Sequence, residues 1–226
     1  MSPVSLPPSR YDFAIDVPAD ADDFVVGGGD LEPATVIEAY RHGFFPMGMG
    51  EGGGPPMGWW SPNPRGVLFA GDHHVSRSLR RARTRFEVTV DSAFDEVVAG
   101  CADPGRDGAW ITPVIAAAYA RLHELGWAHS VEVWNAAGDL VGGLYGIAIG
   151  GFFAGESMFH RETDASKVAL WATADIVFGD RDEERLFDVQ WQTPHLASQG
   201  VRQVSRTEYL DRLARAVRAE APVKWF

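Results

Sequence analysis

The sequence contains one cysteine, Cys101, among its 226 residues. A single cysteine excludes an internal disulfide framework and indicates a reducing compartment. We interpret Cys101 as a small buried residue rather than a nucleophile. Basic residues are also scarce, because 20 Lys and Arg against 31 Asp and Glu give a net charge of −11. This charge argues against general attraction to nucleic acid, although it leaves room for a local basic patch.

Long apolar segments are missing as well. The N-terminal segment MSPVSLPPSRYDFAID has no apolar run of the kind that a signal peptide needs. The uncharged run 140–155 is broken by glycine and is shorter than the roughly 20 residues of a membrane-spanning helix. We therefore expect a cytoplasmic protein that does not associate with a membrane.

Two common sequence motifs are absent. No GxGxxG motif follows a predicted strand, and no Walker loop is present. The histidines at 73, 74, 123 and 129 lack a third ligand at a spacing that suits a metal ion. With 46% hydrophobic and 23% charged residues, the chain otherwise has the composition of an ordinary soluble protein that folds unaided.

The other predicted elements are arranged around a glycine-rich apolar stretch at 140–159, LVGGLYGIAIGGFFAGESMF. With the preceding HSVEVW it predicts three consecutive antiparallel strands, at 130–134, 140–149 and 152–159. Gly150-Gly151 would close the second hairpin, because a primed two-residue turn needs positive φ. Six glycines between Gly142 and Gly155 cost strand stability. We interpret them as room for another molecule that lies against the sheet.

Helices and single strands surround this predicted meander. The helix at 112–125 has the strongest signals, with Thr112 as N-cap, Pro113 in the first turn and Gly126 past the end. Other helices are predicted at 75–83, 92–101, 165–178 and 207–217, and other strands at 66–69, 86–90 and 186–191. One strand, two helices, an antiparallel meander, a helix and another strand is the order of the GNAT acyltransferase fold. We therefore expect an α+β domain with a mixed, mainly antiparallel sheet flanked by helices.

The N-terminal part differs in composition from the rest. It is rich in Pro, Asp and Ser up to about Gly29 and is expected to be extended, with one short helix between Pro33 and Gly43. Residues 47–58, MGMGEGGGPPMG, predict a flexible loop. The following Trp59-Trp60 pair is interpreted as packing. We expect a small N-terminal module at 1–62 and a catalytic domain at 63–226.

Polar residues inside two apolar strands are the first candidates for chemistry. Asp188 and Gln190 lie two residues apart on a strand, so both side chains would point to one face. Phe187, Val189 and Trp191 would point to the other face, toward the core. An acid and an amide are costly to bury without partners. Either the two side chains form a structural pair whose hydrogen bonds are made within the fold, or they form a functional site with Glu156 of the glycine-rich stretch. Such a site could hold an ammonium group and help to take its proton.

A run of arginines is the second candidate. The segment 74–85, HVSRSLRRARTR, predicts a helix with Val75, Leu79 and Ala82 in one narrow arc. The remainder of the surface carries Arg77, Arg80, Arg81, Arg83 and Arg85. A solvated face is the alternative, but such a face normally mixes acids with arginines, and no acid interrupts this one. The pattern favours a phosphate-binding patch.

The sequence resembles the bacterial leucyl/phenylalanyl-tRNA–protein transferases over residues 27–213. The similar segments are GGDLEPATVIEAYRHGFFP, WWSPNPRGVLF, HVSRSLRR, AWIT, LHELGWAHSVEVW, LVGGLYGIAIGGFFAGESMF, DASKVAL and FDVQWQTPHLASQG. The resemblance implies transfer of Leu or Phe, and Met less well, from aminoacyl-tRNA to the N-terminal Arg or Lys of a protein, which marks that protein for N-degron proteolysis. The donor is an activated ester, so no cofactor or metal is implied. We expect a monomer.

The resemblance also implies roles for single residues. Asp188 would accept or relay the proton of the acceptor amine, and Gln190 and Glu156 would orient the ammonium group and stabilise the tetrahedral intermediate. Trp110 would contact the terminal adenosine. The apolar pocket for the transferred side chain would be formed by Leu144, Phe153 and Leu170.

Two features complicate this assignment. Phe153 and Glu156 would lie on opposite faces of a regular strand, so we expect a β-bulge near Gly155 that brings them to one site. Met47 stands where the family often has an aromatic residue. The alternatives are an acyl-CoA-dependent N-acetyltransferase of the GNAT fold, or a non-catalytic module that binds tRNA or peptides. The acetyltransferase is disfavoured because HRETDASK replaces the glycine-rich pyrophosphate turn.

Overall fold

The computed structural model describes residues 2–18, 21–106, 109–179, 182–222 and 225. Within these residues the strands are β1 (Phe24–Gly27), β2 (Phe45–Gly48), β3 (Met57–Ser61), β4 (Arg65–Leu68), β5 (Glu87–Val90), β6 (Ala128–Trp134), β7 (Leu140–Ile149), β8 (Phe152–His160), β9 (Leu186–Gln190) and β10 (Arg202–Val204). The helices are α1 (Pro33–Arg41), α2 (Arg77–Arg83), α3 (Phe94–Cys101), α4 (Pro113–Glu124), α5 (Ala165–Phe178), α6 (Pro194–Ser198) and α7 (Arg206–Ala216), with a 3₁₀ turn, η1, at Glu51–Gly53.

The described strands form two sheets. The smaller sheet has the order β1-β3-β2, and the larger has the order β10-β4-β9-β8-β7-β6-β5. Neighbouring strands are antiparallel except β8 and β9, which are parallel. The predicted meander is present as β6, β7 and β8, and Gly150, with a φ of 57°, turns the second hairpin. The α+β class and the mixed, mainly antiparallel sheet are confirmed.

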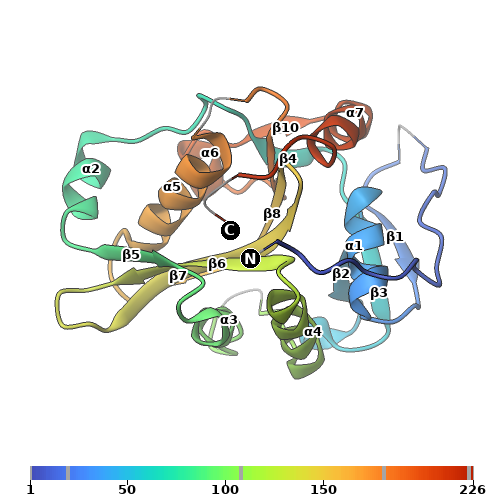
Figure 1. Ribbon diagram of the computed structural model, residues 1–226, viewed down its shortest axis with the longest axis horizontal. Helices are drawn as coiled ribbons and strands as arrows, with labels where there is room; N and C mark the ends of the chain where they lie inside the picture. Colours follow the sequence, from blue (N-terminus) through green and yellow to red (C-terminus); the bar gives the residue numbers. More distant parts are fainter. Residues whose placement is uncertain (1, 19–20, 107–108, 180–181, 223–224, 226) are drawn as a thin grey trace.

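Helices cover both faces of the large sheet. Figure 1 shows α3 and α4 on one side of β6 and β7, and α5 with α2 and α6 on the other. The side chains of β7 alternate accordingly, since Tyr145 and Ile147 belong to the apolar cluster on the α4 side, and Leu144 and Ala148 to the cluster on the α5 side. Burial on both faces explains why β7 is a continuous apolar run rather than an alternating one.

The glycines of β7 make room for the chain's own helices. A Cβ on Gly142 would lie 2.7 Å from the Cβ of Ala165 in α5, and one on Gly143 would lie 2.9 Å from a methyl group of Val97 in α3. The interpretation that another molecule lies against these positions is wrong. The glycines allow α3 and α5 to approach the sheet closely from its two sides.

The segment predicted as a flexible loop, 47–58, is a connection only at 49–56, and the residues at its two ends belong to the paired strands β2 and β3. β2 pairs with β3 in the register Met47↔Gly58, and the Trp60 indole donates a hydrogen bond to the Met47 carbonyl at 2.9 Å. The Trp59 ring is 2% exposed and its Nε1 donates to the Gly28 carbonyl at 2.8 Å, so packing is confirmed for both tryptophans. Composition misled the prediction because the glycines lie mainly in the connection 49–56.

The N-terminal sheet packs closely against the rest of the molecule. Phe44 and Trp59 belong to the same apolar cluster as Phe94 and Ile115. The small sheet ends at Ser61 and the large one starts at Arg65. We retain a division into 1–62 and 63–226 as a proposal about folding units, since the two parts share this core.

Candidate active site

A cavity opens where the parallel strands stop pairing. β8 and β9 pair only between Phe152–Ala154 and Leu186–Asp188. The next residues of both strands line a cavity of about 100 Å³. Its lining residues are Leu144, Gly155, Glu156, Ser157, Met158, Leu170, Val189, Gln190 and Leu196. It is therefore a narrow apolar cavity with two polar residues, Glu156 and Gln190, among its lining residues.

The expected bulge is present beside this cavity. Tyr145 pairs with Ser157 and Gly146 with Gly155, so Glu156 is the extra residue in β8. The break near Gly155 is confirmed, but its predicted consequence is wrong. The Glu156 carboxyl group lies with tyrosines on the α4 side, whereas Phe153 lies on the α5 side. The bulge falls too late in the strand to change the face of Phe153.

The carboxyl group of Glu156 sits between two tyrosines. Tyr40 of α1 donates to its Oε1 at 2.6 Å, and Tyr119 of α4 donates to its Oε2 at 2.9 Å. The two phenol oxygens also lie 2.6 Å apart. Glu156 is 8% exposed and both tyrosines are buried. The cluster therefore joins the N-terminal helix, α4 and the bulge of β8.

Proton counting explains the titration of this cluster. The three side chains make three oxygen–oxygen contacts, but when Glu156 is ionised only two phenolic protons are available for them. A proton on the carboxyl group supplies the third hydrogen bond. Burial raises the pKa of Glu156 to about 7; hydrogen bonds from Tyr40 and Tyr119 oppose this rise and the Asp188 charge adds to it. Burial, with the Glu156 charge, raises the pKa of both phenols well above 10, so they remain neutral. Glu156 can thus gain or lose a proton near neutral pH.

Asp188 has a different environment. Arg65 of β4 donates to it twice, from Nε to Oδ1 at 2.9 Å and from Nη2 to Oδ2 at 2.7 Å. Tyr209 of α7 donates to Oδ2 at 2.9 Å, and the Gln190 backbone N–H to Oδ1 at 2.9 Å. Asp188 and Arg65 are completely buried. Burial opposes the charge of Arg65, but Asp188 raises the pKa of the guanidinium above its ordinary value, so the guanidinium keeps its charge.

The backbone of Gln190 is unusual. Its φ of 58° is in the left-handed region, which is uncommon for a residue other than glycine and is frequent at functional sites. Its side chain is 6% exposed, and Nε2 is buried without a hydrogen-bond partner. The regular alternation ends here, so Asp188 and Gln190 do not share one environment. The expected inward direction of Trp191 is also wrong, since it is 36% exposed and contacts the Phe45 ring.

The predicted site residues fall into two groups. Glu156, Gln190, Leu144 and Leu170 meet at the cavity, as expected. Asp188, Phe153 and Trp110 do not line it. Phe153 is buried behind the wall, stacked on Trp225 at 5.1 Å and edge-on to Phe187 at 5.2 Å. Trp110 lies next to the N-terminal hairpin, where a Cβ on Gly53 would come within 2.2 Å of its carbonyl oxygen.

Sequence reasoning missed four polar residues of the site, namely Arg65, Tyr40, Tyr119 and Tyr209. All four are buried and come from elements distant from β8 and β9 in the sequence. Only Arg65 had a usable signal, because a charged residue that opens an apolar strand needs a buried partner. The tyrosines lie within the apolar stripes of their helices, so their sequence pattern is that of core residues.

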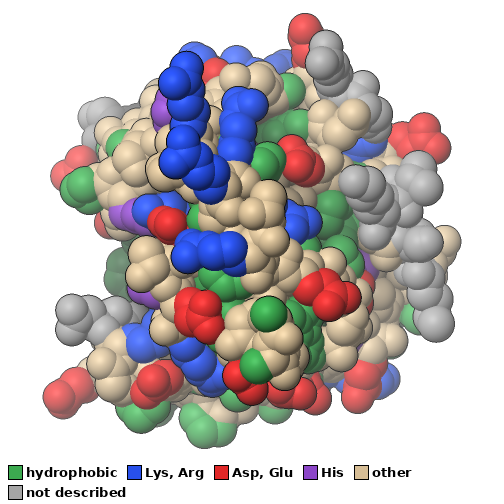
Figure 2. All heavy atoms as spheres, turned by 90° about the vertical axis from the view of Figure 1, so that its left-hand side faces the viewer, with side chains coloured by type: hydrophobic (Ala, Val, Ile, Leu, Met, Phe, Trp, Pro, Cys, Tyr) green, Lys and Arg blue, Asp and Glu red, His purple; other side chains and the backbone are tan. Residues whose placement is uncertain are grey.

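The arginines of α2 and its C-terminal flank form a basic patch. Arg77, Arg80, Arg81 and Arg85 are exposed, and Arg83 is half-buried with a hydrogen bond to the Phe86 carbonyl. None of the five forms an ion pair with another described residue. Figure 2 shows Lys and Arg side chains next to one another in the upper half of this side of the molecule.

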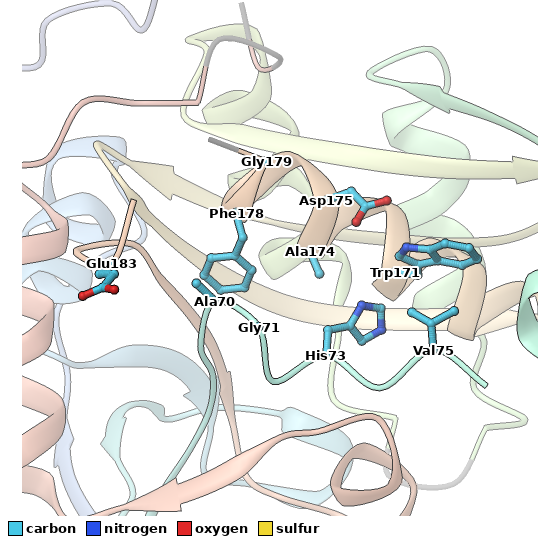
Figure 3. Close-up of a pocket in the computed structure, with 10 residues that line it drawn as sticks. All are labelled: Ala70, Gly71, His73, Val75, Trp171, Ala174, Asp175, Phe178, Gly179 and Glu183. Atoms are coloured by element: carbon cyan, nitrogen blue, oxygen red, sulfur yellow. The ribbon is translucent and has the colours of Figure 1, made fainter. Parts of the chain in front are cut away.

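A larger cavity of about 480 Å³ lies beside α2, between the β4–α2 connection and α5. In Figure 3 His73 and Trp171 lie near one end and Glu183 near the other. Burial, with the neighbouring His74, lowers the pKa of His73 to about 4, so its imidazole is neutral at neutral pH. None of the predicted site residues lines this cavity, and it contributes no cation to the basic patch.

The fold and the cavity between β8 and β9 are those of a candidate acyltransferase. The model of the family "Leucyl/phenylalanyl-tRNA protein transferase" matches residues 67–214, and the model of its N-terminal domain matches residues 29–63. The chain belongs to this family.

Individual relatives agree with the family match. The chain is 51% identical to the leucyl/phenylalanyl-tRNA–protein transferase of Chromohalobacter salexigens, over 88% of this chain and 77% of the relative. It is 47% identical to that of Stutzerimonas stutzeri, over 89% of this chain and 88% of the relative. A GCN5-related N-acetyltransferase from Kribbella flavida aligns in three dimensions with a TM-score of 0.39 and 12% identity, over 76% of this chain and 61% of that one.

Two kinds of feature are absent from the described part of the chain. No group of His, Cys, Asp or Glu side chains there is arranged to hold a metal ion. No described helix combines the length and apolar character that crossing a membrane requires.

Proposed function

We propose that this protein transfers Leu or Phe, and Met less well, from aminoacyl-tRNA to the N-terminal Arg or Lys of acceptor proteins, which marks them for N-degron proteolysis. We further propose that it acts in the cytoplasm as a monomer. Its relatives are named for the tRNA donor and the protein acceptor. The observation that carries the proposal is the unpartnered amide donor of Gln190 in the wall of a narrow apolar cavity.

The cavity suits a single side chain. Its volume of about 100 Å³ is well below the roughly 300–1,000 Å³ of sites that enclose a whole small molecule. Leu144, Leu170 and Met158 contribute apolar walls. An unbranched or γ-branched apolar side chain would enter it, and the ester carbonyl that follows would meet Gln190 at the rim. Gln190 Nε2 would then donate to the carbonyl oxygen and to the oxyanion that develops there.

Glu156 is the group that we propose to take the proton of the acceptor amine. An α-amino group has a pKa of about 7.7–8.0, close to the value of about 7 for Glu156, so transfer between them is nearly balanced. Glu156 releases this first proton to solvent. The free amine attacks the ester carbon and the new N–C bond forms. The nitrogen then loses its second proton to the ionised Glu156, and the bond to the ribose oxygen breaks. The proton held by Glu156 then passes to that ribose oxygen, and the products are an amide and a free hydroxyl.

Asp188 takes a positioning role in this proposal. The expectation that it accepts the amine proton remains a prediction, but both of its oxygens already accept hydrogen bonds from Arg65. Its bond to the Gln190 backbone supports the left-handed conformation that directs the amide. Trp110 and Phe153 remain candidates for contact with the adenosine and for support of the pocket wall.

Transfer of a labelled amino acid tests the proposal directly. Purified protein is mixed with radiolabelled Leu-tRNA and a peptide that begins with Arg, without any added cofactor. We expect label in the peptide and none in a control peptide that begins with Ala. Acetylation of the peptide from acetyl-CoA, without aminoacyl transfer, would support the acetyltransferase instead. Binding of tRNA without any transfer would support a binding module.

A further inference from the structure

A second cavity adjoins the proposed acyl cavity. It has a volume of about 430 Å³, and Met158 lines both cavities. Its charged and titratable lining residues are Arg106, Lys167, His160 and His195, with a single acid, Asp164. Asp164 forms an ion pair with Lys167 at 2.8 Å. Burial, with Lys167 and His160, lowers the pKa of His195, and the Arg106 guanidinium donates to the Cys101 and Met158 carbonyls. Lys167 and Arg106 are therefore the two cations beside the proposed site of acyl transfer.

The N-terminus of α5 opens into the same cavity. Asp164, at the N-cap position, has a φ of 72°, and its side chain accepts no hydrogen bond from a backbone N–H group of the first turn. The backbone N–H groups of Ser166 and Lys167 have no partner among the described residues. An uncapped helix N-terminus favours an anion, through its free N–H groups and its dipole.

Ser166 provides an independent sign of a ligand. Its side chain is 6% exposed and lines the cavity. Its hydroxyl forms no hydrogen bond with another described residue, so it is available to a group that enters the cavity. A hydroxyl donor, two free backbone donors and a lysine around one cavity match the several acceptor oxygens of a phosphate group.

We propose that this cavity binds the phosphate on the 5′ side of the terminal adenosine of the aminoacyl-tRNA. The proposal rests on the proposed function, because the adenosine carries the amino acid whose side chain would fill the neighbouring cavity. On that nucleotide the next anionic group is the phosphate on the 5′ carbon of the same ribose. A shared wall at Met158 fits such a short separation. The subsite would fix the ribose relative to Gln190 and Glu156.

Two donors that differ by one nucleotide, and therefore by one phosphate group, test this assignment. The first is phenylalanyl-adenosine, which has no phosphate, and the second is the phenylalanyl ester of cytidylyl-adenosine. Ser166→Ala and Lys167→Gln should each lower kcat/KM about tenfold with the second donor, which corresponds to the loss of one charge-assisted hydrogen bond, and less than twofold with the first. Arg121→Gln removes an equally charged but exposed residue of α4 and should change neither.

The outcomes separate the subsite from the function itself. Equal losses with both donors, or no loss with either, would overturn the phosphate assignment while transfer itself stands. A wild-type protein that uses neither these donors nor aminoacyl-tRNA would overturn the proposed function instead. As a second readout, 5′-AMP should inhibit transfer from phenylalanyl-adenosine more strongly than adenosine, and Lys167→Gln should remove that difference. Equal inhibition by inorganic phosphate alone would indicate a free-anion site and contradict the assignment.

Discussion

At the residue scale, the ionisation of Glu156 links stability to pH. Its folded pKa of about 7 exceeds the ordinary value of 4.5, so between these values the folded protein binds more protons than the unfolded chain. Stability therefore falls as pH rises through this window, by about 3 kcal/mol at most. Glu156→Gln should be more stable than the wild type at pH 8 and equal to it near pH 4. Urea unfolding at both pH values measures the difference, and a pH-independent difference would contradict this account.

The amide of Gln190 is expected to act on the transition state. Gln190→Ala should lower kcat by about 10²-fold, the usual effect of removing one oxyanion donor, with little change in the KM for phenylalanyl-adenosine. Gln192→Ala is the matched control, because its amide donates to the Val201 carbonyl instead. An increase in KM alone after Gln190→Ala would show that the amide only binds the ground state.

Single residues also show what the sequence could reveal. Glu156 and Gln190 were found because polar side chains interrupt apolar strands, and both line the cavity. Tyr40 and Tyr119 could not be found, because a tyrosine on an apolar helix stripe has the pattern of a core residue. The sequence favoured Asp188 over Glu156 as the proton acceptor because it could not reveal that Arg65 pairs with Asp188. That pairing is a contact between residues far apart in the sequence.

At the scale of elements, the Arg65–Asp188 pair joins β4 to β9. Breaking a buried ion pair on one side leaves an uncompensated charge, so Arg65→Met and Asp188→Asn should each cost about 3–5 kcal/mol. The double variant should cost less than the sum by at least about 1 kcal/mol. The exposed Arg121–Glu124 pair is the control and should contribute less than about 1 kcal/mol.

This double-mutant cycle also separates structure from catalysis. If Asp188 only positions Gln190, the double variant should regain stability but not full turnover, because Gln190 loses its charged support. Additive costs in unfolding experiments would mean that the two residues stabilise the fold independently, which the two hydrogen bonds between them do not suggest.

Elements with strong local signals were predicted well, and short ones were not. α4 and α5 have clear boundaries, and the meander follows from its apolar runs and its glycine turn. α6 and β10 were missed because five and three residues are too few for a periodic pattern. β10 exists through its pairing with β4, which is a tertiary effect that no local pattern contains.

At the scale of the whole molecule, an acidic protein presents one basic face. The net charge of −11 would repel a polyanion at a distance, so we expect a productive encounter with tRNA to depend on the local field of the α2 patch. The sequence predicted this patch because no acid interrupts the five arginines. It could not predict the cavity around Lys167, whose lining residues come from β8, α5, α6 and the loop that holds Arg106.

Charge reversal on α2 tests whether the patch docks the body of the tRNA. Arg80→Glu with Arg81→Glu should weaken binding of any aminoacyl-tRNA to a similar extent, because phosphate contacts carry little sequence information. The slope of log K against log salt should fall by roughly one unit per lost contact. Transfer from phenylalanyl-adenosine, which lacks the RNA body, should remain within about twofold of the wild type.

Arg212→Glu with Arg215→Glu makes the same charge change on α7, where both arginines already pair with glutamates, and should leave the salt slope intact. A loss of the same size with both donors would mean that the α2 arginines support the fold rather than the tRNA.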